Sequence, residues 1–368
     1  MTGFPKHPRE LTESWLSDAF RSAGVLDTNG AVTSFVSTSI GEGVSMVCQV
    51  VRVDIAYAES GGSGPNSVVM KFVHDNDANR SVGLGLRLYE REAAFYNDVV
   101  CDVAVSMPVC YFAAFDSAVG ASLIVLEDLA DCSSVDQVKG ASPSDVCQIM
   151  DALAPLHAAY WGGVNRSFPI AAAKVDGDWC EDYSRIVDGT WENCLVQFGS
   201  FIPKKVVAAL PRYVSSFRQL HRAMGKGRLT LVHGDPRLDN VMFRRKREMV
   251  GAVLLDWQTL MITNPVHDLA LLLSMSVSST VRRKHEVALV RHYHTRLLEH
   301  GVVDYDFDAC LADYNVALLY VMSVALVIGG AYDPANQRGK RLAESVLRRA
   351  CTAVLDRNLL QLIPTEGK

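Results

Sequence analysis

The sequence lacks several features that would assign it to a specialised class of protein. Its nine cysteines include no Cys-x-x-Cys pair and are odd in number, so neither a disulfide framework nor a zinc ribbon is indicated. The first ten residues contain no apolar stretch, so we expect no secretory signal and a cytoplasmic location. The longest uncharged run, residues 315–332, is shorter than the roughly 20 residues of a membrane span. We therefore expect a buried helix there and no membrane partner.

Neither sign of charge dominates the chain. It has 36 Lys and Arg against 41 Asp and Glu, for a net charge of −5, with 21% charged and 49% apolar residues. These values exclude a disordered or collagen-like chain. The slight acidity argues against a nucleic-acid partner, because such proteins usually carry a basic face. A length of 368 residues indicates two domains or lobes and leaves the oligomeric state open.

Strand patterns gather in the first third of the chain, and helical patterns in the remainder. An alternating stretch at 47–57 and an apolar stretch at 67–73, joined by a glycine-rich turn, predict a β-hairpin. Further predicted elements are helices at 11–20 and 85–99, strands at 109–115 and 122–126, and mostly helices from about residue 143.

These patterns predict an α+β architecture with two unequal parts. We expect a small β-rich N-lobe at residues 1–126, an interlobe hinge at 127–131, and a larger, mostly helical C-lobe at 132–368.

The strongest chemical signal is a polar loop between two apolar strands. The loop contains Asp235, Arg237 and Asn240, and a later apolar strand ends in Asp256. If the strands on either side of residues 244–248 pair as a hairpin, Asn240 and Asp256 lie beside one another at its mouth. Carboxylate and amide oxygens of this kind suit Mg²⁺. Asp235 is then free to accept a proton from an alcohol.

The pattern H-G-D-x-x-x-x-N, which starts at residue 233, resembles the catalytic loop of the aminoglycoside phosphotransferase and choline kinase-like superfamily. Asp256 matches the metal-binding aspartate of that superfamily, and Arg237 places the chain near its ecdysteroid-kinase-like group. The resemblance spans residues 35–275 in ordered motifs. It implies a protein-kinase-like bilobal fold and phosphoryl transfer from ATP, or alternatively GTP, with Mg²⁺.

The resemblance also calls for a lysine on the third strand, held by a glutamate on the next helix, to bind the nucleotide phosphates. Lys71 lies in an apolar strand, and Glu92 lies on the apolar face of the following helix, so we expect these two to pair. Glu90 is the alternative partner, but its offset points it away from that face. The alternative is that β-strand 67–73 lies at a sheet edge, with the lysine amine in water.

Two further segments resemble nucleotide-binding parts of the superfamily. Gly41, Gly43 and Ser45 form a candidate loop over the phosphates, although Gly-x-Gly alone is more typical of a plain turn. Glu127 and Leu129 resemble the interlobe linker, whose backbone contacts the adenine edge. An acidic strand-to-loop turn would have the same sequence.

Three residues around the loop have more than one interpretation. His233 is more typical of a structural hydrogen-bonding residue than of a proton shuttle. Arg237 either offsets charge on the transferred phosphoryl group or pairs with Asp239 or another carboxylate. Asp268, at the start of a helix, resembles the aspartate that braces the catalytic loop.

The acceptor substrate is the least determined part of the prediction. The acidic and aromatic stretch 174–192 could bind an amine, or could be an amphipathic helical segment with a solvated face. A hydroxyl-bearing small molecule of the aminoglycoside, amino alcohol, sugar, steroid or hydroxyacyl type is expected.

Two alternative functions compete with the kinase. A nucleotide-binding pseudokinase with a regulatory or scaffold role would keep the fold but not the reaction. A metal-dependent hydrolase would use His233, Asp235 and Asp256, but it leaves Lys71 and Glu92 unexplained.

Overall fold

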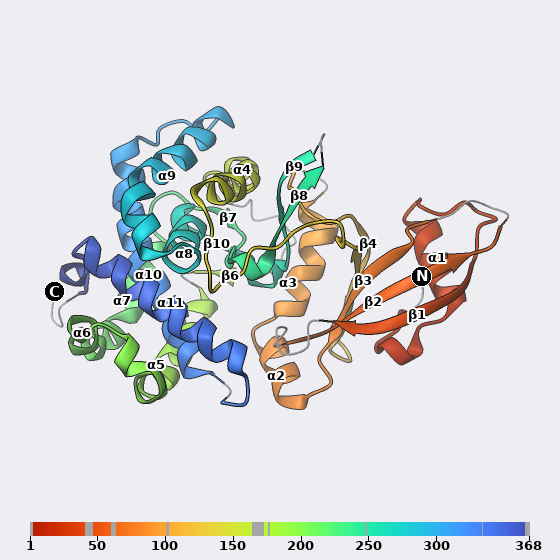
Figure 1. Cartoon of the computed structure of the whole chain (residues 1–368), viewed down its shortest axis with the longest axis horizontal. Helices are drawn as coiled ribbons and strands as arrows, with labels where there is room; N and C mark the ends of the chain where they lie inside the picture. Colours follow the sequence, from red (N-terminus) through yellow and green to blue (C-terminus); the bar gives the residue numbers. More distant parts are fainter. Residues whose placement is uncertain are drawn as a thin grey trace. The chain divides into compact units, whose positions relative to one another are not determined.

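The structure is a computed structural model that describes residues 3–40, 47–59, 64–100, 103–163, 173–175, 177–246, 249–332 and 334–364. It has two compact units (Figure 1). The described residues up to 131, except 103–106, form the N-terminal unit. Residues 103–106 and most of the chain from 132 onward form the C-terminal unit. The hinge assigned to residues 127–131 stays a prediction.

The N-terminal unit is built on an antiparallel sheet of five strands in the order β1-β2-β3-β5-β4. The strands are β1 Val32–Ile40, β2 Cys48–Tyr57, β3 Ser67–Val73, β4 Cys110–Asp116 and β5 Ala121–Glu127. The predicted hairpin and the two later strands are therefore present. β1 was not predicted, because most of its side chains are exposed and it has no clear apolar alternation.

Helices α1 Glu13–Ser22, α2 Asp77–Gly85 and α3 Leu88–Ala94 complete this unit. The single helix predicted over 85–99 is wrong in its extent. Arg87 has a left-handed backbone with φ of 55°, which separates α2 from α3. A π-helical turn, Phe95–Val99, then follows α3 directly.

The alternation of side chains along β3 determines the face of the sheet from which Lys71 projects. Met70 and Phe72 are 0% and 1% exposed and lie in the apolar core with α1 residues such as Leu16. Because side chains alternate across a strand, Lys71 projects from the opposite face of the sheet. β3 lies between β2 and β5, so the alternative of an edge strand with its amine in water is wrong.

The C-terminal unit is mostly helical. Its helices are α4 Pro143–Ala159, α5 Asp178–Phe198, α6 Lys204–Ser215, α7 Phe217–Met224, α8 Val266–Ser276, α9 Ser279–Glu299, α10 Phe307–Gly330 and α11 Gln337–Asp356. Its short strands are β6 Ala173–Lys174, β7 Thr230–Val232 and β10 Met261–Thr263, with the hairpin of β8 Val241–Lys246 and β9 Met249–Leu254.

Helix α10 contains the long uncharged run of the sequence. By length and composition it could cross a membrane, but 56% of its apolar window is buried inside the protein. A Cβ atom on Gly330 would lie 2.2 Å from the carbonyl oxygen of Thr190, so this end of α10 packs directly on α5. α10 is therefore packed as a core helix.

Candidate active site

Lys71 and Glu92 form an ion pair in the N-terminal unit. The Lys71 Nζ lies 2.6 Å from Glu92 Oε1 and 2.7 Å from Oε2, so the amine donates to both carboxylate oxygens. The two side chains are 12% and 1% exposed. Glu90 instead pairs with Arg87 on the outer side of α3. The predicted pair is present, and its role in binding phosphates stays a prediction.

The segment after β5 carries the predicted adenine contacts. The Glu127 N–H donates to the Val109 carbonyl at 2.8 Å, within the β4–β5 region of the sheet. Asp128 accepts from the Ser67 hydroxyl at 2.6 Å and pairs with Arg52 at 2.8 Å. These contacts hold the turn against β2 and β3. The role of the Glu127 and Leu129 backbone in binding a base is untested. Gly41, Gly43 and Ser45 lie outside the described residues.

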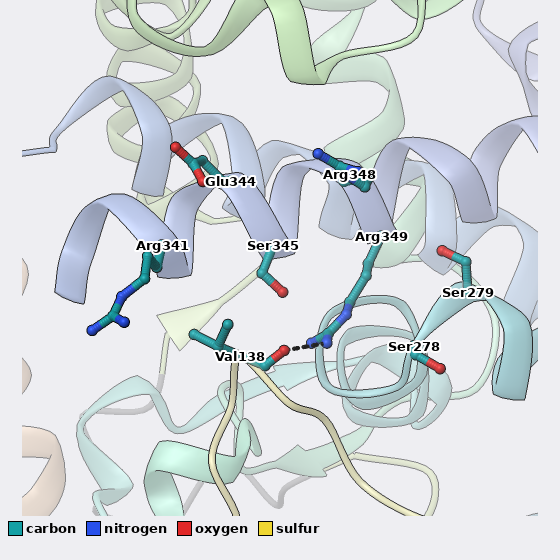
Figure 2. Close-up of a pocket in the computed structure, with 8 residues that line it drawn as sticks. All are labelled: Val138, Ser278, Ser279, Arg341, Glu344, Ser345, Arg348 and Arg349. Carbon is teal, nitrogen blue, oxygen red and sulfur yellow. Dashed lines mark hydrogen bonds between the residues drawn. The ribbon is translucent and has the colours of Figure 1, made fainter. Parts of the chain in front are cut away.

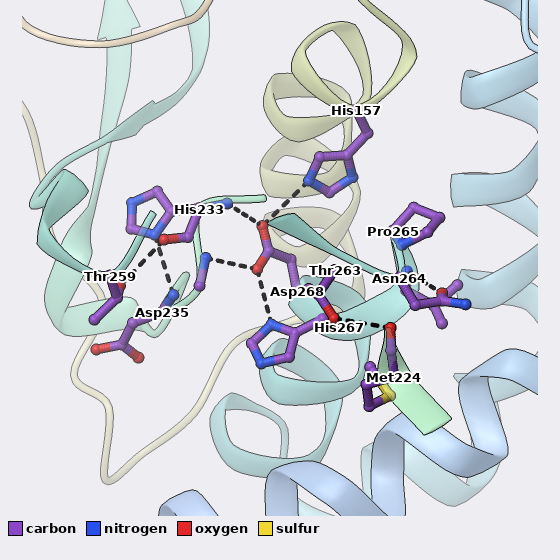
Figure 3. Close-up of polar contacts among 12 residues, drawn as sticks. His157, Met224, His233, Asp235, Thr259, Thr263, Asn264, Pro265, His267 and Asp268 are labelled. Atoms are coloured by element: carbon purple, nitrogen blue, oxygen red, sulfur yellow. Dashed lines mark hydrogen bonds and ion pairs between the residues drawn. The ribbon is translucent and has the colours of Figure 1, made fainter. Parts of the chain in front are cut away.

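The polar loop of the C-terminal unit connects β7 to β8 and is anchored by one buried carboxylate. Asp268, near the start of α8, accepts the backbone N–H of His233 at 2.8 Å and that of Gly234 at 2.9 Å (Figure 3). It also faces His157 Nε2 at 3.2 Å and His267 Nδ1 at 3.3 Å. Asp268 therefore braces the loop, as the sequence indicated.

The charge of Asp268 is stabilised by its partners. Burial by itself would raise the pKa of this carboxyl, because the charged form loses its hydration. The hydrogen bonds from His157 and His267 outweigh that effect and hold the pKa of Asp268 well below its ordinary value. His157 is positioned in turn by the Tyr293 hydroxyl, 2.6 Å from its Nδ1. The loop is thus anchored by an ionised carboxylate, and all the groups that donate hydrogen bonds to it are buried.

Glycine is required at position 234. Gly234 has a φ of 88°, in the left-handed region, and a Cβ atom there would lie 2.1 Å from the carbonyl oxygen of Thr259. The Thr259 hydroxyl also donates to the His233 carbonyl at 3.1 Å. The close approach of these two segments sets the path of the loop toward Asp235.

Asp235 is paired rather than free. Arg237 donates from Nε to Oδ1 at 2.6 Å and from its terminal nitrogen to Oδ2 at 2.7 Å, which is a bidentate contact. Burial by itself would lower the pKa of Arg237, but the charge of Asp235 outweighs this and raises it. The pairing of Arg237 with a carboxylate was one of its two interpretations. Asp239, the other candidate, pairs with Arg338 at 2.6 Å.

Asn240 and Asp256 lie beside one another at the open end of the β8–β9 hairpin. Val241 pairs with Leu254, and the Leu255 N–H donates to the Asn240 carbonyl at 2.9 Å. The Asn240 amide nitrogen donates to the Asp235 carbonyl at 2.9 Å and to its Oδ2 at 3.1 Å. This orientation directs the amide nitrogen toward Asp235 and leaves the amide oxygen as an available ligand.

The backbone at Asp256 is unusual. It is in the left-handed region, with φ of 64° and ψ of 73°. Such a conformation costs a non-glycine residue about 1–2 kcal/mol. Residues in sparsely populated backbone conformations are concentrated at functional sites, so this strain supports a functional role for Asp256.

His233 has a structural environment. Its Nε2 donates to the Leu255 carbonyl at 2.8 Å, and its Nδ1 accepts the Asp235 N–H at 3.2 Å. With both ring nitrogens bound to backbone groups, the imidazole has no nitrogen left for a proton or a metal ion. The hydrolase alternative, which needs His233 as a reactive group, loses its support.

Gln137 was missed by the sequence analysis. Its side chain is fully buried, and its Oε1 accepts the Leu238 N–H of the loop at 2.8 Å. Its Nε2 donates to the Met275 carbonyl at the end of α8 at 3.0 Å. The contact joins residues 101 positions apart, so no local pattern could reveal it.

The acidic stretch 174–192 forms most of α5 and has two faces. Glu181 pairs with Arg218 at 2.9 Å, and Asp182 pairs with Arg185 at 2.6 Å, on the exposed side. On the other side, Trp179 stacks on Tyr183 with ring centroids 5.4 Å apart. These contacts favour the amphipathic helix over an acidic amine site.

The aromatic face of α5 packs against the strands next to the loop, because Trp179 contacts Val232 of β7 and Met261 of β10. Tyr183 is buried among Phe217 and Tyr320, and its hydroxyl contacts that of Ser323 at 3.2 Å. Burial raises the pKa of Tyr183, and the charge of Asp235 raises it further.

Comparison with protein families identifies the chain. Residues 42–302 match the model of the ecdysteroid kinase-like family. The chain belongs to this family. The matched region contains the Lys71–Glu92 pair, the loop with Asp235 and the β8–β9 hairpin, and membership supports a kinase that acts on a small molecule.

Solved structures of small-molecule kinases share the fold. A microcompartment-associated aminopropanol kinase has a TM-score of 0.55 at 14% identity, covering 94% of this chain and 99% of its own. The GDP complex of aminoglycoside 2'-phosphotransferase-IIIa has a TM-score of 0.54 at 12% identity, covering 88% and 93%.

Choline kinase from Cryptosporidium parvum Iowa II has a TM-score of 0.54 at 10% identity, covering 89% of this chain and 92% of its own. A comparison with curated proteins found no significant match. The three solved structures above show that this chain has the protein-kinase-like bilobal α+β fold.

Proposed function

We propose that this chain is an ATP- and Mg²⁺-dependent phosphotransferase that moves the γ-phosphate to a hydroxyl group of a small molecule. The observation that carries the proposal is the arrangement of Asp235, Asn240 and Asp256 on a loop and hairpin braced by buried hydrogen bonds. Phosphoryl transfer depends mainly on positioning and electrostatics, and this arrangement fixes three polar groups in place.

In this proposal Asp235 orients the acceptor hydroxyl and takes its proton. The hydroxyl oxygen forms a bond to the γ-phosphorus as the bond from that phosphorus to the bridging oxygen of ADP breaks. Arg237 now occupies both Asp235 oxygens, so it must release at least one of them to the acceptor. Its freed guanidinium then offsets charge on the transferred group.

Asn240 and Asp256 would hold the magnesium ion. The amide oxygen of Asn240 and the carboxylate of Asp256 are hard oxygen ligands on adjacent positions of the hairpin, which fits an ion that is usually bound by few protein groups and by phosphates. Bound there, Mg²⁺ would neutralise negative charge on the phosphates. Lys71, oriented by Glu92, would bind the nucleotide phosphates in the N-terminal unit. GTP is the alternative nucleotide.

The acceptor in this proposal has an apolar or ring-shaped body. On the aromatic face of α5, Trp179 packs against Val232, which lies just before the loop of Asp235, whereas Glu181 and Asp182 pair with arginines on the exposed side. An acceptor screen should therefore begin with aminoglycosides, sugars, steroids and hydroxyacyl thioesters, and include amino alcohols as the class that the aromatic face does not favour.

The decisive experiment compares Asp235→Asn with Asp188→Asn, an exposed residue of α5. We expect Asp235→Asn to abolish ATP consumption with any acceptor found in the screen, because the hydroxyl loses its base. Nucleotide affinity, measured by calorimetry with Mg²⁺, should stay close to that of the wild type. Asp188→Asn should retain both.

Turnover by Asp235→Asn at the wild-type rate would overturn the proposal. Tight nucleotide binding by the wild type, without ATP hydrolysis or transfer under any condition, would instead support the pseudokinase.

A further inference from the structure

The candidate catalytic loop has two halves with different anchors. Asp268 accepts the N–H groups of His233 and Gly234 in the first half, which leads to Asp235. The second half is a single 3₁₀ turn, Leu238–Asn240, and it ends on the residue that we assign to Mg²⁺. The first N–H groups of a helical turn have no partner within the turn, so they need an acceptor from outside it.

That acceptor comes from a distant part of the chain. Arg237, the residue at the N-cap of the turn, directs its guanidinium to Asp235. The Oε1 atom of Gln137, 101 positions before Leu238, accepts the Leu238 N–H at 2.8 Å. Gln137 and Leu238 are 0% and 1% exposed, so water cannot take the place of this acceptor.

Two hydrogen bonds to the end of α8 orient the Gln137 amide. Its Nε2 donates to the Met275 carbonyl at 3.0 Å, and its Oε1 also accepts the Ser276 hydroxyl at 3.1 Å. Because the nitrogen is bound to a carbonyl, the oxygen faces the loop. The opposite orientation would turn an N–H group toward the Leu238 N–H, which is repulsive. The amide is therefore held in the one orientation that caps the turn.

Arg349 of α11 fixes the backbone at Gln137. The residue is 8% exposed, and its terminal nitrogens donate to four carbonyl groups. These are the carbonyls of Gln137 at 2.8 Å, Met275 at 3.0 Å, Val138 at 2.6 Å and Lys139 at 3.3 Å. Figure 2 shows the bond to Val138, with the guanidinium directed from α11 toward this segment. One side chain thus joins the segment to the end of α8, so Gln137 cannot shift without breaking these bonds.

We propose that Gln137, held in place by Arg349, is the positioning residue of Asn240 and hence of the metal end of the candidate site. The inference rests on the proposed function, in which the Asn240 amide oxygen is a ligand of Mg²⁺. Asn240 is the last residue of a three-residue turn, so a displacement at Leu238 is carried to it directly. The same displacement would break the hydrogen bonds from the Asn240 amide nitrogen to Asp235, which set the direction of its oxygen.

Helix α11 contacts the same turn at a second point. Arg338 pairs with Asp239, the middle residue of the turn, at 2.6 Å. Because the Arg338 side chain is 43% exposed, water screens this pair, and we expect it to contribute less than the buried amide. The two halves of the loop should therefore respond separately, the first to changes at Asp268 and the second to changes at Gln137.

The test uses two replacements of Gln137 and one matched control. Gln137→Met keeps the length of the side chain and removes both its acceptor and its donor. Gln137→Glu keeps an acceptor for Leu238 but loses the donor to Met275. Tyr213→Phe, the control, removes a buried hydrogen bond between α6 and α10, in which the Tyr213 hydroxyl donates to the Leu319 carbonyl at 2.8 Å.

Hydrogen exchange measures the anchor without metal or nucleotide. In Gln137→Met we expect the amides of 237–241 to exchange at least about tenfold faster than in the wild type, and those of 233–235 to change less than about twofold. Gln137→Glu and Tyr213→Phe should keep exchange at 237–241 within about threefold of the wild type. Unchanged exchange at 237–241 in Gln137→Met would overturn the proposal. Equal acceleration in all three variants would also overturn it, because that result indicates general loosening of the unit.

A titration with Mn²⁺ in place of Mg²⁺ measures the metal end, by electron paramagnetic resonance in the presence of a non-hydrolysable ATP analogue. Contacts that orient a metal ligand typically change metal affinity roughly 10- to 100-fold, so Gln137→Met should bind Mn²⁺ more weakly by about that factor. Tyr213→Phe should change the affinity less than about twofold. Equal Mn²⁺ affinity in Gln137→Met and the wild type would overturn the positioning role.

The two measurements separate this role from the reaction itself. A wild type that binds no Mn²⁺ with the analogue would overturn the proposed function, whereas the exchange result would still decide whether Gln137 anchors the turn. If Gln137→Met does not fold, Ser276→Ala removes one of the hydrogen bonds that orient the same amide. Exchange at 237–241 in Ser276→Ala no faster than in Tyr213→Phe would then overturn the proposal.

Discussion

Two buried carboxylates, one in each unit, hold functional groups in different ways. Glu92 of the N-terminal unit orients the single amine of Lys71. Asp268 of the C-terminal unit accepts two backbone N–H groups and faces two imidazoles. Glu92 thus fixes one side chain, whereas Asp268 fixes the path of the chain itself.

The difference predicts different consequences of substitution. A side chain that loses its orienting partner still reaches water, because Lys71 is 12% exposed. Backbone N–H groups that lose a buried acceptor have no replacement, and each unpaired group costs about 1–3 kcal/mol. Changes at Asp268 should therefore affect stability first, and changes at Glu92 should affect activity first.

The largest expected effect is that of Asp268→Asn. The amide keeps the shape of the carboxylate but presents an N–H group to donors, so at least one loop N–H is left unpaired. We expect the free energy of unfolding to fall by about 3–5 kcal/mol, measured by urea denaturation. Asp188→Asn is the control and should change it by less than about 0.5 kcal/mol. A fall in Asp268→Asn no larger than that of the control would contradict the anchoring role.

The pH dependence of the wild type gives a second measure of the same anchor. The folded-state pKa of Asp268 is lowered, so its contribution to stability is present above the unfolded-state pKa of about 4. That contribution is lost as the pH falls below this value toward the folded-state pKa. Stability of Asp268→Asn should accordingly decline less than that of the wild type between about pH 5 and pH 3.

Gly234→Ala should have the next largest effect. The added Cβ atom would lie 2.1 Å from the Thr259 carbonyl oxygen, on a backbone with φ of 88°. We expect a loss of about 2–4 kcal/mol of stability from strain and overpacking, together with loss of turnover. Gly189→Ala on α5, where a Cβ atom meets nothing within 4 Å, should be neutral or slightly stabilising in the same urea denaturation assay.

Glu92→Gln should have the smallest effect on stability and a clear effect on activity. The amide still accepts from Lys71 but no longer supplies a charge, so we expect a loss of about 1–3 kcal/mol. Nucleotide affinity and turnover should fall on the order of 10- to 100-fold, as for other residues that orient a functional group. Glu90→Gln, at the exposed Arg87 pair, is the control. Full activity in Glu92→Gln, equal to that of the Glu90→Gln control, would contradict the role of Glu92 in orienting Lys71.

The parts of the site that the sequence could predict are those with a local pattern. Strand alternation predicted the strand at 47–57 that pairs with the strand of Lys71, and the helical period placed Glu92 on the apolar face of the next helix. The hairpin that brings Asn240 next to Asp256 followed from two apolar strands and a basic turn. These are periodicities of 2 and 3.6 residues, which a single sequence displays.

The missed parts are set by contacts between distant segments. Two hydrogen bonds, that of Gln137 with Leu238 of the loop and that of His157 with Asp268, join residues more than 100 positions apart. β1 was missed because its mostly exposed Ser and Thr residues show no buried face. The break at Arg87 depends on a single left-handed residue, which the helical period of its neighbours conceals.

The pair of Asp235 and Arg237 has a consequence for the unfolded chain. Its partners are separated by Pro236 alone, whose ring fixes φ near −65° and limits the conformations available to the segment. Closing a contact over two residues costs far less chain entropy than the long-range contacts made by Gln137. We therefore expect the chain entropy lost in forming this pair to be small, and no distant segment is needed to bring the counter-ion of Asp235 beside it.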